Sequence, residues 1–256
     1  MFLLPFDIQS PFLRLIHSFE FARKTFRYKR FVFLGKKYSY FCHRYNATWK
    51  NERAVEVPIA WRFLHIQLRK KLLQTASKPW RDTIESKEFS FSVLEVGDVL
   101  SHYFPLSNLQ EGAKKCGFLN YTVLDKYEKA GHVINEDVIE YSPRTKFDYI
   151  CGISTLEHVG YDEDAPDRCK TLKALHTLKG LLNPGGRLLV TFPLGYNPNL
   201  DVLLKSGFFG FTRTYFLQRT THLNAWRQVR YKDVSKAKYD QPFHNANAVC
   251  VAWFDA

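Results

Sequence analysis

The chain has 256 residues, 45% of them hydrophobic, which is enough to bury one substantial core and an appended element. No apolar run approaches the roughly 20 residues that cross a bilayer, and the opening residues carry neither a basic region nor a cleavage site, so we expect no transmembrane segment and no signal peptide. The net charge of +12 lies outside the middle of the chain: residues 91–201 contain 15 acids and 11 bases, whereas residues 23–44 contain eight bases and no acid.

Five cysteines are scattered along the chain without a C-x-x-C pair. This pattern argues against a disulfide framework and against a zinc site, so no metal is expected. Cys151 and Cys250 fall in apolar segments and are expected to be buried. The cysteines therefore favour a reduced, cytoplasmic environment.

The first 90 residues predict a helical and aromatic extension. Ser10-Pro11 reads as an N-cap followed by proline at the first helical position. The aromatic stretch Phe31–Phe41, with a glycine and two lysines in its middle, predicts a short hairpin. A second helix is expected over residues 51–71, followed by a polar loop over Leu73–Ser90.

Four short apolar strands are predicted from residue 92 onward, at residues 92–97, 121–125, 147–154 and 185–192. Acidic residues follow the first two, and a helix with a leucine stripe is predicted over Pro166–Leu182. Strands separated by helical or loop stretches are typical of a parallel sheet with crossover connections. In such sheets ligands bind beyond the carboxyl ends of the strands, where these acids lie.

The C-terminal part predicts the closing elements of the sheet. A helix is expected around Thr214–Arg219, followed by an antiparallel pair formed by Trp226–Val234 and Ala246–Phe254. The predicted fold is therefore α/β.

The turn after the first core strand narrows the kind of ligand. It contains Gly97 but lacks the other two glycines of the dinucleotide fingerprint. Glu95 and Asp98 flank this glycine, and their carboxylates would repel a pyrophosphate. The turn therefore favours a cationic cofactor without phosphate.

Several segments resemble the motifs of class I S-adenosylmethionine (SAM)-dependent methyltransferases over residues 91–256. The first strand and its turn resemble the loop that holds the methionine part of SAM, and the strand ending at Asp125 resembles the one whose acid binds the ribose. More narrowly, the sequence is similar to a little-characterised prokaryotic methyltransferase group. The segments that carry these resemblances are Asn51–Glu56, Val93–Tyr103, Val123–Lys126, Asn135–Val138, Phe147–Val159, Leu181–Gly186 and Pro193–Pro198.

The resemblance implies a Rossmann-like, seven-stranded, mainly parallel sheet with an antiparallel last strand. It implies two regions, a lid or substrate-side extension over residues 1–90 and a SAM-binding domain over residues 91–256. The residues implied to bind SAM are Glu95, Gly97, Asp98, Ser101, Asp125, Lys126, Asp137, Val138 and Ser154. His158 is a candidate general base, and the candidate acceptor contacts are Tyr196, Arg213, Glu52 and Arg53.

The expected activity is methyl transfer from SAM to an O, N or C nucleophile of a small acceptor, anionic or linked to a saccharide or lipid. The basic segments outside residues 91–201 (the basic arms) have three possible roles: they bind an anionic membrane surface, they bind a nucleic acid, or they form a solvated cover over the sheet. The alternatives are therefore an RNA-directed methyltransferase and a non-catalytic relative that binds an anionic partner.

Overall fold

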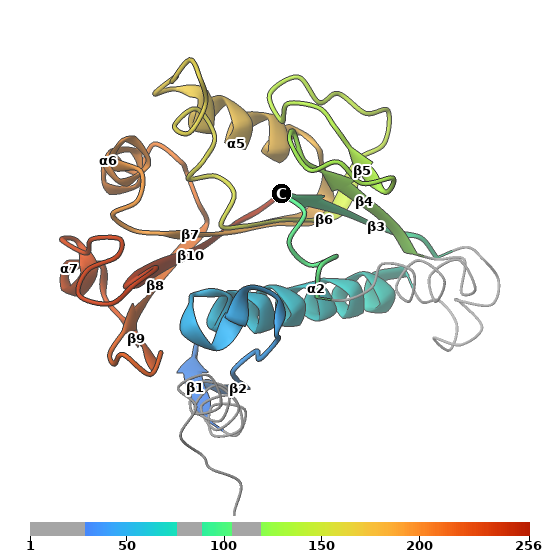
Figure 1. Ribbon diagram of the computed structural model, residues 1–256. Helices are drawn as coiled ribbons and strands as arrows, with labels where there is room; N and C mark the ends of the chain where they lie inside the picture. Colours follow the sequence, from blue (N-terminus) through green and yellow to red (C-terminus); the bar gives the residue numbers. More distant parts are fainter. Residues whose placement is uncertain (1–28, 76–88, 104–118) are drawn as a thin grey trace, which may run out of the picture.

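The computed structural model describes residues 29–75, 89–103 and 119–256. Its main feature is an eight-stranded sheet in the order β5-β4-β3-β6-β7-β10-β8-β9 (Figure 1). The predicted helix that begins at Ser10-Pro11 lies outside the described residues, as does most of the predicted loop over Leu73–Ser90.

The first five strands of this order run parallel; β3, β4, β6 and β7 correspond to the four predicted strands, whereas the short β5 was not predicted. β3 lies in the centre and pairs with β4 on one side and with β6 on the other. The order of connection reverses at β3, which makes this the topological switch point of the sheet. The bounds of the parallel strands are Phe91–Val96 for β3, Leu119–Leu124 for β4, Val133–Ile134 for β5, Phe147–Ile153 for β6 and Leu182–Pro193 for β7.

The other half of the sheet is antiparallel and differs in detail from the prediction. β10 (Ala248–Asp255) lies between β7 and β8 and runs antiparallel to both. The predicted helix at Thr214–Arg219 is wrong, because these residues form strand β8 (Arg213–Arg219). β9 (Trp226–Val229) pairs with β8 rather than with β10 and adds an eighth strand to the seven expected.

Helices cover both faces of the sheet (Figure 1). Alternate residues of the strands point to opposite faces, so that Val93 packs in the core under α2 (Arg53–Thr75) while Leu94 packs in the core under α5 (Lys170–Gly180). α2 is tied to the sheet by the Tyr149 hydroxyl, which donates a hydrogen bond to the Ala60 carbonyl at 3.0 Å. α6 (Pro198–Ser206) and the short α7 (Tyr231–Val234) follow β7 and β9.

The described N-terminal residues pack against the sheet and share a hydrophobic core with it. The predicted hairpin is confirmed as β1 (Arg30–Phe33) and β2 (Lys36–Ser39), and the 3-10 helix η1 (Tyr45–Lys50) leads from it into α2. Phe31 and Phe33 are buried in the same core as α2.

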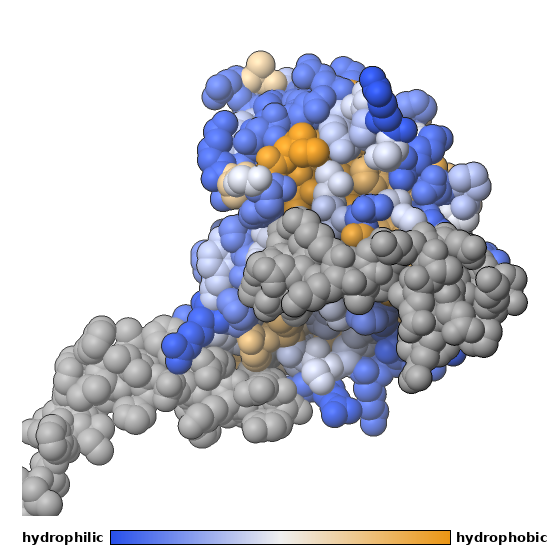
Figure 2. Space-filling model, turned by 90° about the vertical axis from the view of Figure 1, so that its right-hand side faces the viewer, coloured by the Kyte–Doolittle hydropathy of each residue, from blue (hydrophilic) through white to orange (hydrophobic). Residues whose placement is uncertain are grey.

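The surface and the interior agree with the composition. Cys151 and Cys250 are buried, as predicted. The face shown in Figure 2 is mostly hydrophilic, with hydrophobic residues in small groups. None of the helices described is both long enough and apolar enough to cross a membrane.

Candidate functional site

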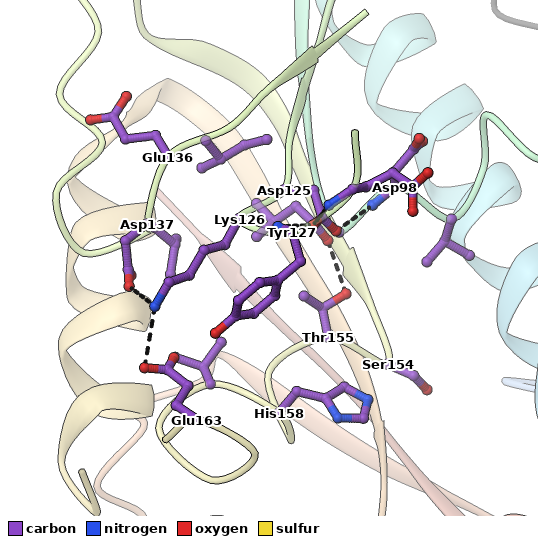
Figure 3. Close-up of a pocket in the computed structure, with 17 residues that line it drawn as sticks. Asp98, Asp125, Lys126, Tyr127, Glu136, Asp137, Ser154, Thr155, His158 and Glu163 are labelled. Carbon is purple, nitrogen blue, oxygen red and sulfur yellow. Dashed lines mark hydrogen bonds and ion pairs between the residues drawn. The ribbon is translucent and has the colours of Figure 1, made fainter. Parts of the chain in front are cut away.

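A cavity of about 370 Å³ opens at the carboxyl ends of β3, β4 and β6 (Figure 3). This is the position that the predicted parallel sheet assigns to a ligand. Most of the residues that the sequence nominates for the cofactor lie in its wall, and His158 lies there with them. The nominated residues that line the cavity are Gly97, Asp98, Asp125, Lys126, Asp137, Val138, Ser154 and His158.

Gly97 is required by the fold of the turn itself. Its φ of 82° lies in the left-handed region that favours glycine, and its N–H donates to the Leu124 carbonyl at 2.9 Å. A Cβ atom at this position would overlap the hydroxyl of Thr155. Thr155 in turn donates a hydrogen bond to the Val96 carbonyl at 3.0 Å, so the turns after β3 and β6 pack directly on each other.

Glu95 lies behind the cavity wall and not in it. Its carboxyl group accepts hydrogen bonds from the Val99 N–H at 2.9 Å, the Leu100 N–H at 2.5 Å and the Tyr121 hydroxyl at 2.6 Å. Burial raises the pKa of Glu95 to about 7, against the opposing effect of these hydrogen bonds. The structure therefore places Glu95 as a support of the cofactor turn.

Asp98 is held by two side chains on its own side of the cavity. Its Oδ2 lies 3.0 Å from Nε2 of His132, and the Ser101 hydroxyl donates to its Oδ1. Ser101 does not line the cavity and contacts it through Asp98. His132 is a partner that the sequence analysis missed, because nothing in its surroundings matches a known motif.

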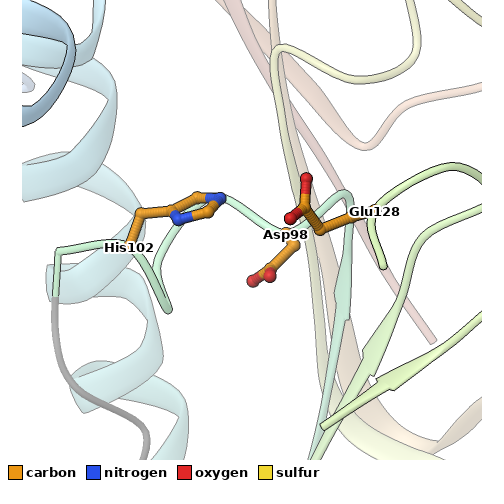
Figure 4. Close-up of side chains that lie close together, drawn as sticks. All are labelled: Asp98, His102 and Glu128. Carbon is orange, nitrogen blue, oxygen red and sulfur yellow. The ribbon is translucent and has the colours of Figure 1, made fainter. Parts of the chain in front are cut away.

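Asp98, His102 and Glu128 form a further grouping, shown in Figure 4. One ligand atom from each lies within 4.8 Å of the others. A cation at this point would compete with Ser101 and His132 for the oxygens of Asp98. The geometry alone therefore does not assign a metal to it.

Asp125 joins the two turns that flank the cavity. Its Oδ1 accepts hydrogen bonds from the N–H groups of Tyr127 at 2.8 Å and Glu128 at 2.9 Å, and its Oδ2 accepts one from the Asp98 N–H at 3.1 Å. A carboxylate offers about four lone-pair sites, so one remains for a ligand.

An ion-pair network closes one end of the cavity. Lys126 lies 2.9 Å from Asp137 and 3.3 Å from Glu163, as the dashed lines in Figure 3 show. Lys170 from α5 pairs with the same two acids at 2.6 and 2.5 Å. Burial alone would raise the pKa of Asp137, but hydrogen bonds from Lys170 and Lys126 hold it below its usual range. Glu163 and Lys170 were not nominated from the sequence.

The end of β6 connects the cavity to the N-terminal helix. Ser154 has a φ of 41°, which is rare for a residue with a side chain, and it lines the cavity. Its hydroxyl donates to Oε1 of Glu56 at 2.7 Å, across 98 residues of sequence. Oε2 of Glu56 pairs with Arg53 at 2.6 Å. The candidate acceptor contacts Glu52 and Arg53 therefore lie at the start of the helix, α2, whose Glu56 reaches the cavity wall.

His158 is oriented by a carboxylate. Its Nδ1 lies 2.5 Å from Oδ2 of Asp162, and the same oxygen accepts a hydrogen bond from the Tyr196 hydroxyl at 2.7 Å. The rings of His158 and Tyr196 pack edge to face, with their centroids 5.0 Å apart. Burial and then the hydrogen bond to Asp162 raise the pKa of Tyr196. The structure thus brings together the candidate base and the candidate acceptor contact Tyr196.

Arg213, nominated as an acceptor contact, begins β8 and does not line the cavity. It pairs with Trp253 in the sheet, and Trp253 pairs with Leu189, well before the carboxyl end of β7 at Pro193. Its exposed side chain bonds to the Thr212 carbonyl at 3.0 Å. Leu189 is in register with Cys151 of β6, and Cys151 with Glu95 of β3, so Arg213 lies level with the end of β3 but is separated from it by β6, β7 and β10.

The fold is the Rossmann-like α/β arrangement that the methyltransferase resemblance implied: a parallel sheet covered by helices, with its last strand inserted antiparallel. No protein-family model matches the chain, and neither does any curated protein.

Solved structures of methyltransferases are among those similar to this chain. It is similar to the N-methyltransferase NodS from Bradyrhizobium japonicum WM9 in complex with S-adenosyl-L-homocysteine (SAH), at 13% identity and a TM-score of 0.39, over 73% of this chain and 95% of that one. It is similar to phosphoethanolamine N-methyltransferase 2 from Haemonchus contortus, at 13% identity and a TM-score of 0.37, over 79% and 58% of the two chains. A SAM-dependent methyltransferase from Clostridium acetobutylicum ATCC 824 matches at 12% identity and a TM-score of 0.33, over 77% and 98%. At TM-scores below 0.5 these similarities carry no argument about the activity of this chain.

Proposed function

We propose that the chain is a SAM-dependent methyltransferase whose cavity at the ends of β3, β4 and β6 binds the cofactor. The observation that carries this proposal is the charge of a cavity at the topological switch point. Six of the lining residues are acids and one is a lysine, and the acids are Asp98, Asp125, Glu128, Glu136, Asp137 and Glu163. Such a wall suits a ligand with an ammonium and a sulfonium group, and it disfavours a pyrophosphate.

The cavity suggests where each part of SAM would lie. The remaining lone pair of Asp125 would accept a ribose hydroxyl, and Asp137 and Val138 would border the adenine. The oxygens of Asp98 and Glu128, which lie close together in Figure 4, would face the ammonium group of the methionine part. This arrangement directs the sulfonium toward Ser154 and His158.

The residues around His158 supply the remaining chemistry. SAM, when bound, supplies a methyl group that is already reactive toward a nucleophile. His158 would take a proton from the acceptor, since an imidazole with one nitrogen held by a carboxylate presents the other nitrogen in a fixed direction. Asp162 would be the positioning residue that holds Nδ1.

The N-terminal region would form the acceptor side of the site, with residues 91–256 as the cofactor domain. This division is supported by the contact between Glu56 and Ser154, which places the start of α2 against the cavity wall. The acceptor would be a small molecule, held between these elements and Tyr196.

Calorimetry tests the proposal directly. Titration with SAM and with SAH should each show binding at one site per chain, whereas NAD, which carries a pyrophosphate, should produce no heat. The proposal would be refuted if neither SAM nor SAH produced heat with protein that circular dichroism shows to be folded. Binding of SAH without turnover of any acceptor would favour the non-catalytic alternative.

A further inference from the structure

A cluster of buried carboxyl groups lies behind Ser154 and His158. Glu52, Glu56 and Glu157 have exposed fractions of 8%, 0% and 2%. Glu56 is neutralised by Arg53 at 2.6 Å and also accepts the Ser154 hydroxyl. Arg53 is the basic side chain that ion-pairs within this cluster, so the described residues hold more acid than base at this point.

Glu157 is the member of the cluster with a carboxyl oxygen that has no hydrogen-bond partner among the described residues. This oxygen, Oε2, is fully buried. Its Oε1 lies 3.8 Å from Nε2 of His158, which lines the cavity, so the carboxyl group is directed toward the reactive end of the site. A buried carboxyl oxygen without a partner is costly, and this cost is removed when a ligand donates a hydrogen bond to it.

Aromatic rings lie beside this carboxyl group. The ring of Tyr196 contacts both His158 and Tyr239, with centroid separations of 5.0 Å in each case. Burial raises the pKa of both tyrosines, and the charge of the Glu157 carboxyl raises each further. Carboxylates combined with aromatic faces are the usual means by which proteins hold an ammonium group.

The cluster also borders a hollow that is separate from the cofactor cavity. This second hollow, of about 480 Å³, is lined by Glu52 and Arg53, together with residues of η1 and of the turn before β10. Arg53 contacts Glu56, and Glu56 contacts Ser154 in the cavity wall. The acidic cluster therefore lies between the two hollows, where an acceptor entering from one side would meet a methyl group presented from the other.

From this geometry we infer that the methyl acceptor is an amine, bound as its ammonium form by Glu157 beside the contacting rings of Tyr196 and Tyr239. The inference rests on the proposed function and names its acceptor class. The ammonium first transfers a proton to His158, which releases it to solvent. The neutral nitrogen then forms its bond to the methyl carbon while the bond from that carbon to sulfur breaks and the electron pair stays on sulfur.

This assignment replaces the anionic acceptor that the basic arms suggested. An anion at this point would add a negative charge beside three carboxyl groups, which the guanidinium groups of Arg53 and Arg219 balance only in part. Burial raises the pKa of Glu157 well above its ordinary range, and the neighbouring Glu56 carboxyl raises it further, which is the condition that a bound cation relieves.

The test uses three probes of one shape on SAH-saturated protein: cyclohexylamine, cyclohexanol and cyclohexanecarboxylate, followed by ligand-observed NMR. The amine should bind and the other two should not. Glu157→Gln should weaken amine binding by about tenfold or more, because a charged hydrogen bond is lost, while SAH still binds. Tyr239→Leu, which keeps the carboxyl group, should also weaken the amine.

Asp148→Asn is the matched control, since it removes a buried carboxyl from the opposite end of β6. This variant should leave amine binding unchanged. Binding of the alcohol or the carboxylate as tight as that of the amine would overturn the inference, as would an amine affinity that Glu157→Gln leaves unchanged or the lack of binding of all three probes. If SAH itself fails to bind the wild type, the proposed function fails instead.

Discussion

Gly97→Ala tests whether the turn after β3 is shaped by its contact with the turn after β6. At a φ of 82°, alanine costs about 1–2 kcal/mol relative to an ordinary conformation. Its Cβ would also displace the Thr155 hydroxyl, which donates to the Val96 and Ile153 carbonyls at 3.0 and 3.2 Å. The hydroxyl has a single proton, which the two carbonyls share, so its loss costs about 0.5–1.5 kcal/mol, and the substitution should lower the free energy of unfolding by about 1.5–3.5 kcal/mol in total.

Urea denaturation measures this loss, and two further variants separate its causes. Gly35→Ala has a φ of 69° and open space around its Cβ, so it should show only the backbone cost of about 1–2 kcal/mol. Thr155→Ala combined with Gly97→Ala should lose less stability than the sum of the two single variants, by about 1 kcal/mol. Strict additivity, or a Gly97→Ala cost equal to that of Gly35→Ala, would refute the reasoning.

Three other substitutions test the supports of the cavity. Asp125→Asn should weaken SAH binding in calorimetry by about tenfold, and a change below about twofold would rule out the ribose contact. Glu95 has a folded pKa of about 7 and an ordinary value of 4.5, so its folded form binds the proton more tightly and wild-type stability should fall as pH rises from 4.5 through 7. Relative to Glu95→Gln, that fall should be about 3 kcal/mol in urea melts, and a parallel pH dependence in both proteins would contradict the assigned burial. Lys170→Met should destabilise the protein by about 1–3 kcal/mol because Asp137 and Glu163 lose a buried partner, whereas Lys173→Met, which removes an exposed lysine, should leave the stability nearly unchanged; equal effects of the two would show that the network is not structural.

The parallel half of the sheet could be predicted because its signals are local. Each strand from β3 to β7 is a short apolar run, and the acids that end β3 and β4 follow directly in sequence. β8 was taken for a helix because its residues become buried only by pairing with β10, about 30 residues later in the chain. Pairing with a distant strand overrides the local conformational preference of a segment, and a short stretch of sequence does not reveal it.

The site divides in the same way. Gly97, Asp125 and Ser154 could be nominated because each directly follows a strand whose end the sequence reveals. The side chains that orient them could not be nominated, since Glu56 reaches Ser154 across 98 residues and His132 reaches Asp98 across 34. Arg213 could not be located from the sequence because its position depends on the register of β8, which places it level with the end of β3 but across β6, β7 and β10 from it.

A crystal structure of the protein grown with saturating SAH tests the central claim most directly. The account predicts SAH in the cavity at the ends of β3, β4 and β6, with its ribose hydroxyls at Asp125, its adenine beside Asp137 and Val138, and its sulfur toward Ser154 and His158. SAH bound elsewhere on the chain, or a cavity that stays empty at saturating SAH, would contradict it.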